Sequence, residues 1–591
     1  MSILKTRRFL PLFITQFLGA FNDNLFKNAM LMLITFRLAE QSGLNAQVLV
    51  PVAAGVFILP FFLFSATAGQ LADKYDRAAI ARWVKLAEIG LMALAAIGFI
   101  LPSVWILMIL LFGMGAHSTF FGPVKYAILP QHLKPEELLA GNAYVEAATF
   151  LSILLGTIAG GLLVMAEGGA WVISIAIIAV AIAGYIASRN IPPAPGPMPD
   201  LKVNPKFWSE TGRMMRDTQQ DVAVYRCILA ISWFWLVGAT YLTQFPSYAK
   251  DYLHSDETVV TLLLTIFSVG IGVGSVLCEK LLKGRVQLTY VPLAAIGMAI
   301  FGVDLYFATG HAASHVVDET QFITAGVFAS TLGGMRVLAD LFLIAVCGGM
   351  FVVPLYAMVQ QRAKGNMLAR TIAGLNVMNS LFMVVSAVIC VILLQMSFSI
   401  PVIFLVMALC NILTALYIVH LLPEDLMRSV ARAILGWAYG VEIKGLENFE
   451  AAGKRVLIVA NHTSFLDAAL IAAYLPVKIT FAVNTHIASK WWIKPFLTLV
   501  DAFPLDPTNP MAVKSLVEEV KQDKIAMIFP EGRITVTGSL MKVYEGPGLI
   551  ADKAQARLLP IRIDGAQYTP FSRLRGKVHI RICLLYTSPS P

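Results

Sequence analysis

The sequence has few charged residues, which excludes an ordinary soluble protein. Only 14% of its 591 residues are Asp, Glu, Lys or Arg, whereas 58% are hydrophobic and the mean hydropathy is +0.73. Soluble domains carry roughly 25% charged residues, so most of this length cannot lie in water. The chain is also too long for one domain. The composition therefore predicts a polytopic helical membrane protein with a second part attached.

Three further absences narrow the function. The six cysteines form no CxxC pair and five lie inside apolar stretches, so we expect neither a disulfide framework nor a metal site. The first apolar run is long and lacks a small-residue cleavage site, so we expect no cleavable signal peptide. The net charge is +9, but the basic residues gather in short loops between apolar runs. That placement is a topology signal, and we expect no nucleic-acid partner.

Apolar stretches of about 20 residues, long enough to span a bilayer, recur as far as residue 423. The twelve predicted spans start near residues 9, 49, 80, 104, 140, 170, 223, 258, 287, 336, 370 and 399. A polar break at 190–222 divides them six and six. Lys and Arg concentrate in alternate loops, and the positive-inside rule then places both ends of the membrane part in the cytoplasm.

A weak internal repeat supports two related halves. The segments "FGPVKYAILPQ" (121–131) and "FVVPLYAMVQQ" (351–361) share Phe, Tyr, Ala and Gln at an offset of 230 residues. Each closes an even-numbered span and leads into a basic loop. Parallel six-span halves are the arrangement of major facilitator transporters. The sequence therefore predicts an all-α major facilitator fold of twelve helices for residues 1–423.

After Pro423 the pattern changes to that of an α/β domain. A short connector helix is expected at 424–440, and helical patterns alternate with short β-rich runs up to residue 582. The predicted strands are 455–460, 478–483, 525–530, 558–563 and 577–582. The ending "CLLYTSPSP" (583–591) breaks this pattern, so we expect a truncated or chimeric end, with a short disordered tail as the alternative.

Polar groups inside the membrane part are the first functional candidates. Charge at mid-bilayer costs about 3 kcal/mol unless it faces a partner or a wet cavity. For "FNDNLFK" (21–27) two interpretations stay open, a structural Asp–Lys lock between helices and a substrate-facing role for Asp23. The candidates are Asn22, Asp23, Asn24, Lys27, His117, Lys125 and Glu146.

The loop "GQLADKYDR" (69–77) is the second candidate. Gly69 allows close helix approach, and Asp73 can cap a neighbouring helix or pair with the basic loop that includes Arg77. Such a charge cluster, formed in one conformation and broken in another, would latch a rocking transporter. The alternative is a loop that only sets the topology.

Together with "QFLGAFNDN", "GNAYVEAAT" (141–149) and the two repeat segments, this loop resembles the lysophospholipid transporter family of the major facilitator superfamily. The resemblance covers residues 1–423 and implies inward flipping of lysophospholipids across a bacterial inner membrane. It also implies that Asp23, Lys125 and Glu146 occupy polar positions of that family. The internal arginine expected in span seven is absent from 227–245.

The α/β part carries a candidate catalytic pair. In "IVANHTSFLDAAL" (458–470) a strand leads into His462, and Asp467 follows just inside a helix. A histidine can take a proton from an alcohol while the aspartate fixes its tautomer and supports the imidazolium. "FPEGRIT" (529–535) then places Glu531, Gly532 and Arg533 at the end of another strand, a suitable clamp for phosphate or carboxylate.

In order, "NHTSFLD", "PLDPTNP" (504–510), "FPEGRIT" and "LLPIRI" resemble the glycerolipid acyltransferase family over residues 440–582. The resemblance implies that His462 deprotonates a lysophospholipid hydroxyl, which attacks an acyl thioester of acyl-carrier protein or coenzyme A. Asp467 would orient His462, and Glu531, Gly532 and Arg533 would hold the phosphate-bearing acceptor. No tightly bound cofactor is expected.

One departure concerns phosphate binding. Many of these acyltransferases carry an arginine where this chain has Pro507, which leaves Lys514 or Arg533 to bind phosphate. The variant resembles enzymes that reacylate lysophosphatidylethanolamine and continue into an acyl-carrier-protein synthetase, a module not present here. The apolar segment 488–497 could dock the domain on the membrane or admit the acyl chain, and a packed helix face is the alternative.

The two parts together predict lysophospholipid import followed by re-acylation. The partners would be the lysophospholipid, membrane lipids and acyl-carrier protein. Two other hypotheses stay open, a transporter with an inactive acyltransferase-like module and a drug or small-solute exporter fused to an acyltransferase.

Overall fold

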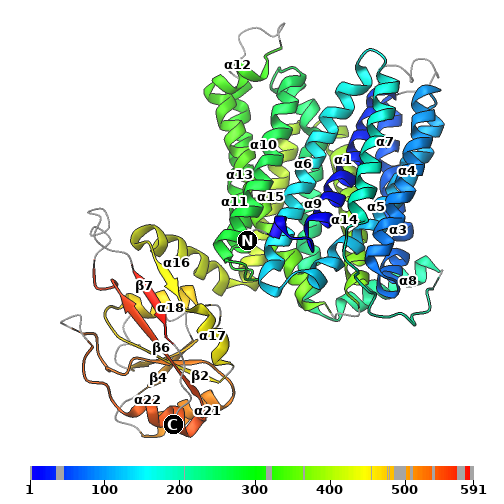
Figure 1. Ribbon diagram of the computed structural model, residues 1–591. Helices are drawn as coiled ribbons and strands as arrows, with labels where there is room; N and C mark the ends of the chain where they lie inside the picture. Colours follow the sequence, from blue (N-terminus) through cyan, green and yellow to red (C-terminus); the bar gives the residue numbers. More distant parts are fainter. Residues whose placement is uncertain are drawn as a thin grey trace. The chain divides into compact units, whose positions relative to one another are not determined.

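The computed structural model (Figure 1) divides the chain into two compact units, Met1–Val419 and His420–Pro591. The structure describes residues 3–34, 46–204, 206–313, 322–363, 367–453, 455–475, 477, 479–484, 501–505, 510–535, 540–568 and 580–585.

The first unit is a bundle of long helices in two sets of six. The first set is α1 (Leu10–Leu33), α3 (Ala46–Lys74), α4 (Arg77–Ile100), α5 (Val104–His132), α6 (Leu138–Met165) and α7 (Gly169–Ser188). The second set is α9 (Val222–Ser247), α10 (Glu257–Leu282), α11 (Val291–Ala313), α13 (Leu332–Arg362), α14 (Leu368–Gln395) and α15 (Ile400–Leu421). The shorter α8 (Phe207–Gln219) separates the sets. Short helical segments are η1 (Ile3–Lys5), η3 (Pro135–Glu137), η4 (Tyr248–Tyr252) and α12 (Ala325–Ser330).

Several helices begin at a polar residue that satisfies their first N–H groups. Such N-caps stop a helix from extending into the preceding loop, because their side chains replace the missing backbone acceptors. The capping side chains are Asp76, Ser103, Asp221, Asp256 and Thr331. Each lies at the start of a predicted span.

Eleven helices of the described chain are long and apolar enough to cross a membrane. The further 24-residue helix α1 carries the polar "NDN" segment and packs against α6 and α7. With α1 the bundle has the twelve long helices that the hydropathy pattern predicts, and the six-plus-six architecture is confirmed.

The two halves meet at their repeat segments. Tyr126 of α5 and Tyr356 of α13, which are equivalent in the 230-residue repeat, stack with ring centroids 4.8 Å apart and planes 9° from parallel. Next to them, Asn142 of α6 and Gln360 of α13 exchange two hydrogen bonds of 2.7 and 3.1 Å. The repeat thus supplies a buried contact between the halves.

The second unit is an α/β domain with a seven-stranded sheet in the order β1-β7-β6-β2-β5-β3-β4. All pairs are parallel except β6 with β7. The strands are β1 (Glu442–Lys444), β2 (Val456–Ala460), β3 (Thr480–Asn484), β4 (Asp501–Leu505), β5 (Ala526–Ile528), β6 (Arg557–Asp564) and β7 (Arg581–Leu584). The helices are α16 (Pro423–Tyr439), α17 (Leu446–Ala452), α18 (Leu466–Tyr474), α21 (Pro510–Lys521) and α22 (Gly546–Ala554).

Strand β2 shows how the sheet is covered on both faces. Val456, Ile458 and Ala460 pack in one core with residues of α16 and α18. Leu457 points to the other face, where it packs with α21 and α22. The alternation follows from the two-residue period of a strand, and burial on both faces explains why this strand reads as a continuous apolar run.

The sequence pattern located β2, β3, β5 and β6 but missed β1 and β4. These two strands lie at the edges of the sheet, where one side is unpaired and the apolar pattern is weaker. Strand β4 even contains Pro504, which an edge strand tolerates. The last strand begins at Arg581 and includes Cys583 and Leu584, so the segment 583–591 starts inside β7, with Leu584 buried.

Candidate functional sites

The catalytic candidates gather at one edge of the α/β sheet. Strand β2 ends at Ala460, directly before Asn461 and His462, and β5 ends at Ile528, directly before the loop with Glu531. These strands are parallel neighbours, so their carboxyl ends meet at the same edge. Ligand and catalytic groups of open α/β sheets lie there. Asn461 holds the loop by exchanging two hydrogen bonds with the backbone of Ile563.

His462 and Asp467 face each other. Nδ1 of the imidazole lies 3.0 Å from Asp467 Oδ2. The same carboxylate accepts hydrogen bonds from the backbone N–H groups of Thr463 (2.6 Å) and Ser464 (2.8 Å). Because Asp467 is fully buried and acts only as an acceptor, Nδ1 must carry the proton. This tautomer leaves Nε2 as the basic nitrogen, and the side chain of His462 is 17% exposed.

The imidazole is also held from the side by an aromatic ring. Phe529, directly after β5, stacks on His462 with centroids 4.0 Å apart and planes 14° from parallel. Together with the bond from Nδ1 to Asp467, this stack restricts rotation about both side-chain torsions. A base fixed in this way needs little reorganisation before it takes a proton.

Glu531 has a positioning contact that the sequence did not reveal. Its buried carboxylate accepts from the backbone N–H of His462 (2.9 Å) through Oε1 and from that of Met541 (2.9 Å) through Oε2. A carboxylate whose two oxygens serve backbone donors is a poor ligand for a phosphate of the same charge. The geometry therefore supports a role for Glu531 in positioning the loop of residues 461–465, which we call the histidine loop, rather than a contact with the acceptor.

We expect Glu531→Gln to lower the kcat of acyl transfer about tenfold and to leave KM for the lysolipid within about twofold. The amide keeps one acceptor, but its NH₂ group would face the second backbone donor, which disturbs the loop without removing a substrate contact. Steady-state kinetics in detergent checks this split. A large rise in KM with kcat unchanged would instead make Glu531 a ligand of the acceptor.

The other predicted phosphate ligands are exposed. Gly532 adopts φ +65°, a conformation that favours glycine and turns the chain after Glu531. Arg533 follows it with an exposed side chain. Lys514 is exposed on α21, and no contact within the described residues joins it to the histidine loop. Pro507 and the segment 488–497 lie outside the described residues.

In the membrane unit, Asp23 belongs to a buried polar cluster contributed by three helices. Ser118 of α5 donates to Asp23 Oδ2 (2.5 Å), and His117 Nδ1 lies 3.9 Å from Asp23 Oδ1. Glu88 of α4 lies 3.1 Å from His117 Nε2 and 2.6 Å from the ammonium of Lys85.

The two interpretations of this segment, an Asp–Lys lock between helices and a substrate-facing role for Asp23, both stay predictions. The ammonium of Lys27 lies 5.5 Å from the ring centre of Phe57. Asn22 donates to Glu88 (2.7 Å), which links α1 to α4 through one side-chain hydrogen bond. Lys85 and Glu88 were not among the predicted residues, although two opposite charges three residues apart in an apolar helix are a visible signal.

Glu146 and Lys125 lie beside the tyrosine stack between the halves. Tyr126 donates to Glu146 Oε1 (2.5 Å), while Oε2 is buried without a hydrogen bond from the described residues. The ammonium of Lys125 lies 4.7 Å from the ring centre of Tyr126. The carboxyl group of Glu146 thus contacts the hydroxyl of Tyr126, and the ammonium of Lys125 lies near the ring of the same tyrosine.

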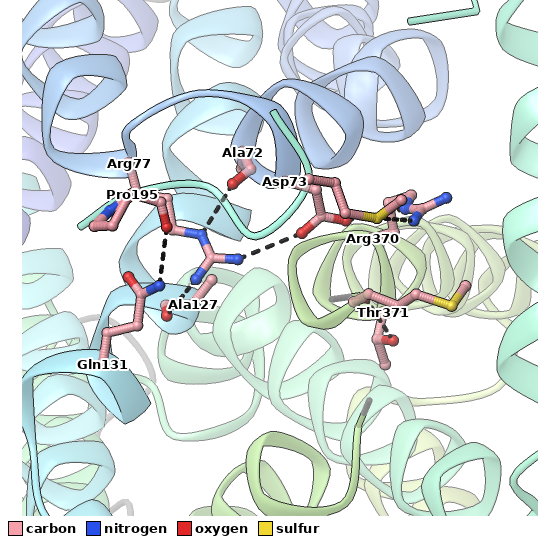
Figure 2. A network of polar contacts seen from close by, with 10 residues as sticks. Ala72, Asp73, Arg77, Ala127, Gln131, Pro195, Arg370 and Thr371 are labelled. Carbon is pink, nitrogen blue, oxygen red and sulfur yellow. Dashed lines mark hydrogen bonds and ion pairs between the residues drawn. The ribbon is translucent and has the colours of Figure 1, made fainter. Parts of the chain in front are cut away.

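The predicted latch loop forms an ion-pair network across the two halves (Figure 2). Asp73, buried at the end of α3, lies between two guanidinium groups. Arg370 of α14 donates to Asp73 Oδ2 (2.9 Å), and Arg77 approaches Oδ1 at 3.4 Å. Arg77 also donates to the carbonyls of Ala72 (2.9 Å) and Ala127 (3.1 Å).

Glycine at position 69 makes the network possible. A Cβ there would lie 2.9 Å from the Cβ of Ala373 and 3.0 Å from the Cα of Arg370, so only glycine lets α3 approach α14 this closely. The segment between the halves is attached to this loop and to α5, because Met198 N–H donates to the Asp73 carbonyl (2.9 Å) and Gln131 of α5 donates to that of Pro195 (3.1 Å; Figure 2). Asp73 therefore bridges the two halves through Arg370, and Arg77 holds Asp73 from within the first half.

Comparison with known proteins is consistent with this architecture. Residues 12–339, more than half of the chain, match the family model described as Major Facilitator Superfamily. The chain belongs to the major facilitator superfamily. Residues 440–564 of this major facilitator protein match the family model described as Acyltransferase. It is therefore a multi-pass membrane protein with a C-terminal acyltransferase domain.

The curated relatives match the membrane unit. The lysophospholipid transporter LplT of Serratia proteamaculans (strain 568) is 26% identical over 377 residues, which cover 62% of this chain and 83% of that protein. LplT of Escherichia coli O1:K1 / APEC is 27% identical over 360 residues, covering 59% and 79%. These similarities confirm the resemblance to lysophospholipid transporters that the sequence motifs indicated.

Among solved structures, the human organic anion transporter MFSD10 (TETRAN) matches with a TM-score of 0.54 and 12% identity. The match covers 69% of this chain and 98% of that chain. At this identity the likeness shows the major facilitator fold alone.

Proposed function

We propose that this protein imports lysophospholipids and re-esterifies them to phospholipids. One observation carries the proposal. The ordered His462–Asp467 pair, with Nε2 of the imidazole available as a base, lies in an acyltransferase domain fused to a membrane unit similar to lysophospholipid transporters. Both parts would act on the same single-chain lipid.

The proposed chemistry is transfer of an acyl group from a thioester to a hydroxyl. Nε2 of His462 takes the proton of the lysolipid hydroxyl as its oxygen attacks the thioester carbonyl carbon. The tetrahedral intermediate collapses with cleavage of the C–S bond, and the imidazolium returns the proton to the leaving thiolate. Asp467 stabilises the imidazolium through Nδ1–H in both steps.

The exposed cation of Arg533, beside the turn at Gly532, supports binding of a phosphate-bearing acceptor, with Lys514 as a further candidate. The thioester would be that of acyl-carrier protein or coenzyme A. The exposed side chains of Phe465 and Tyr544 give the edge of the histidine loop an apolar character suited to an acyl chain.

For transport, we propose that Lys125 and Glu146 contact the head group. A zwitterionic head group carries a phosphate and an ammonium, which these opposite charges complement. Asp23, in its buried cluster, would take part from α1. The basic loops support a cytoplasmic location of the N-terminus and of the acyltransferase domain at a bacterial inner membrane.

Proteoliposomes provide a direct test. Acyl-carrier protein loaded with an acyl group is sealed inside, and labelled lysophosphatidylethanolamine is added outside. We expect labelled diacyl lipid, because the lysolipid reaches the domain only after import. Vesicles without protein are the control, and a parallel assay in detergent measures acylation without any need for transport.

The two assays distinguish a failure of import from a failure of acylation. Product in detergent with none in vesicles would contradict import, and dye efflux from the same vesicles would then favour the exporter hypothesis. Lysolipid uptake without product in either assay would show a transporter with an inactive acyltransferase-like module.

A further inference from the structure

Helix α16 exposes an apolar face. The exposed residues Val430, Ala433, Ile434 and Trp437 follow one another at helical spacing, and we call them the apolar stripe. Ile434 is 59% exposed and Trp437 82% exposed. Residues separated by three or four positions share one side of a helix, so the stripe is one continuous surface.

The opposite face of α16 is fixed to the acyltransferase domain. Leu435 and Tyr439 are buried in the core that also contains residues of α18 and β2. Arg432 donates to the carbonyl of Ala473 (2.5 Å), and Arg428 donates to that of Val477 (3.0 Å). Both arginines thus bind the domain, and the apolar stripe is a second apolar face of α16, in place of the polar face that an ordinary surface helix turns outward.

The chain sequence places this helix next to a bilayer. Helix α15, one of the candidate spans, ends at Leu421, and α16 begins at Pro423 with a single residue between them. Proline at the first helical position starts a new helix without losing a hydrogen bond. A non-helical residue spans at most about 3.6 Å, so one linking residue cannot carry the start of α16 far from the membrane surface where α15 ends.

We propose that the apolar stripe lies in the head-group region of the bilayer that α15 spans and holds the acyltransferase domain at the membrane surface. A helix with aliphatic and Trp side chains on one face buries that face at the boundary between head groups and acyl chains. Helix α18, which carries Asp467, packs on α16. The stripe thereby sets the distance between the histidine loop and the lipids.

Fluorescence quenching tests the location directly. The full chain and its Trp437→Phe variant are placed in nanodiscs with lipids brominated at carbons 6 and 7, or at carbons 11 and 12. The difference between the two proteins reports the Trp437 emission. We expect the shallower bromines to quench it at least twofold more than the deeper ones. Emission that neither lipid quenches overturns the proposal and shows that protein or water covers the stripe.

A functional comparison separates docking from folding, and this second test rests on the proposed acyl transfer. Ile434→Glu should lower the rate of acylation of bilayer-embedded lysolipid at least fivefold. The rate of acylation of a water-soluble short-chain lysolipid should stay unchanged. The matched control is Leu549→Glu on α22, because Leu549 is also an exposed aliphatic side chain of the same domain. This variant should change neither rate. An equal loss with both substrates, or no loss with either, contradicts a docking role. If the wild type transfers no acyl group while Trp437 is quenched, the acyltransferase proposal fails and the membrane contact stands.

Discussion

Replacing His462 by alanine should lower acyl transfer at least about 10³-fold while lysolipid uptake stays within twofold of the wild type. A positioned general base contributes about 10²–10⁴-fold, and here the same imidazole also protonates the leaving thiolate. The bond from Nδ1 to Asp467 and the stack on Phe529 fix it for this role. Transfer of labelled acyl groups to lysophosphatidylethanolamine in detergent measures the first quantity, and vesicle uptake the second.

The matched control is His132→Ala, which removes an imidazole from α5 in the membrane unit. It should leave acylation in detergent unchanged. Equal incorporation of label by wild type and His462→Ala would assign the base to another residue. A parallel loss of uptake would show that the variant damages the protein as a whole.

The helical bundle could be predicted from the sequence because hydropathy is a local property. The predicted first residue of each span lies within four residues of the first residue of an observed helix, as at Arg77 of α4 and Leu332 of α13. The sheet was harder to predict, since strand pairing is decided by contacts distant in sequence. Its central strands are apolar throughout, whereas β1 has three residues and lies at an edge.

In the acyltransferase site, too, contacts that are local in sequence could be predicted and contacts distant in sequence could not. The His462–Asp467 contact spans five residues and follows from one loop and the start of α18, so the motif spacing was enough to predict it. The bond from the His462 backbone to Glu531 spans 69 residues and involves an N–H group that every residue has. No side-chain pattern could have indicated it, and the resemblance suggested a substrate contact instead.

The contacts of the Asp73 loop could be predicted only in part. The sequence left two roles open for Asp73, capping a neighbouring helix or pairing with the basic loop, and in the structure Asp73 pairs with Arg370, which is 297 residues away. Several loop arginines had the required charge and topology. The choice among them depends on the close approach of α3 to α14 at Gly69, a tertiary feature.

Removing this charge should have the largest effect on transport. We expect Asp73→Asn to lower lysolipid uptake at least about tenfold, because it leaves Arg370 and the buried Arg77 without their shared anion. Removing one partner of a buried ion pair costs about 3–5 kcal/mol, and here the pair joins the two halves. The conformation in which the two halves touch through Asp73 and Arg370 would lose population relative to the conformation in which this contact is broken.

A double-mutant cycle decides whether the Asp73–Arg370 contact carries this effect. Arg370→Met should also lower uptake, and the double variant should be less impaired than the sum of the single effects predicts, because both remove one interaction. The exposed pair of Arg455 and Asp523 in the acyltransferase domain is the control, since surface ion pairs contribute about 0–1 kcal/mol. Asp523→Asn should keep uptake within twofold. Additive losses in the cycle would show that Asp73 and Arg370 act independently, and the contact between α3 and α14 would then stabilise the fold without taking part in transport.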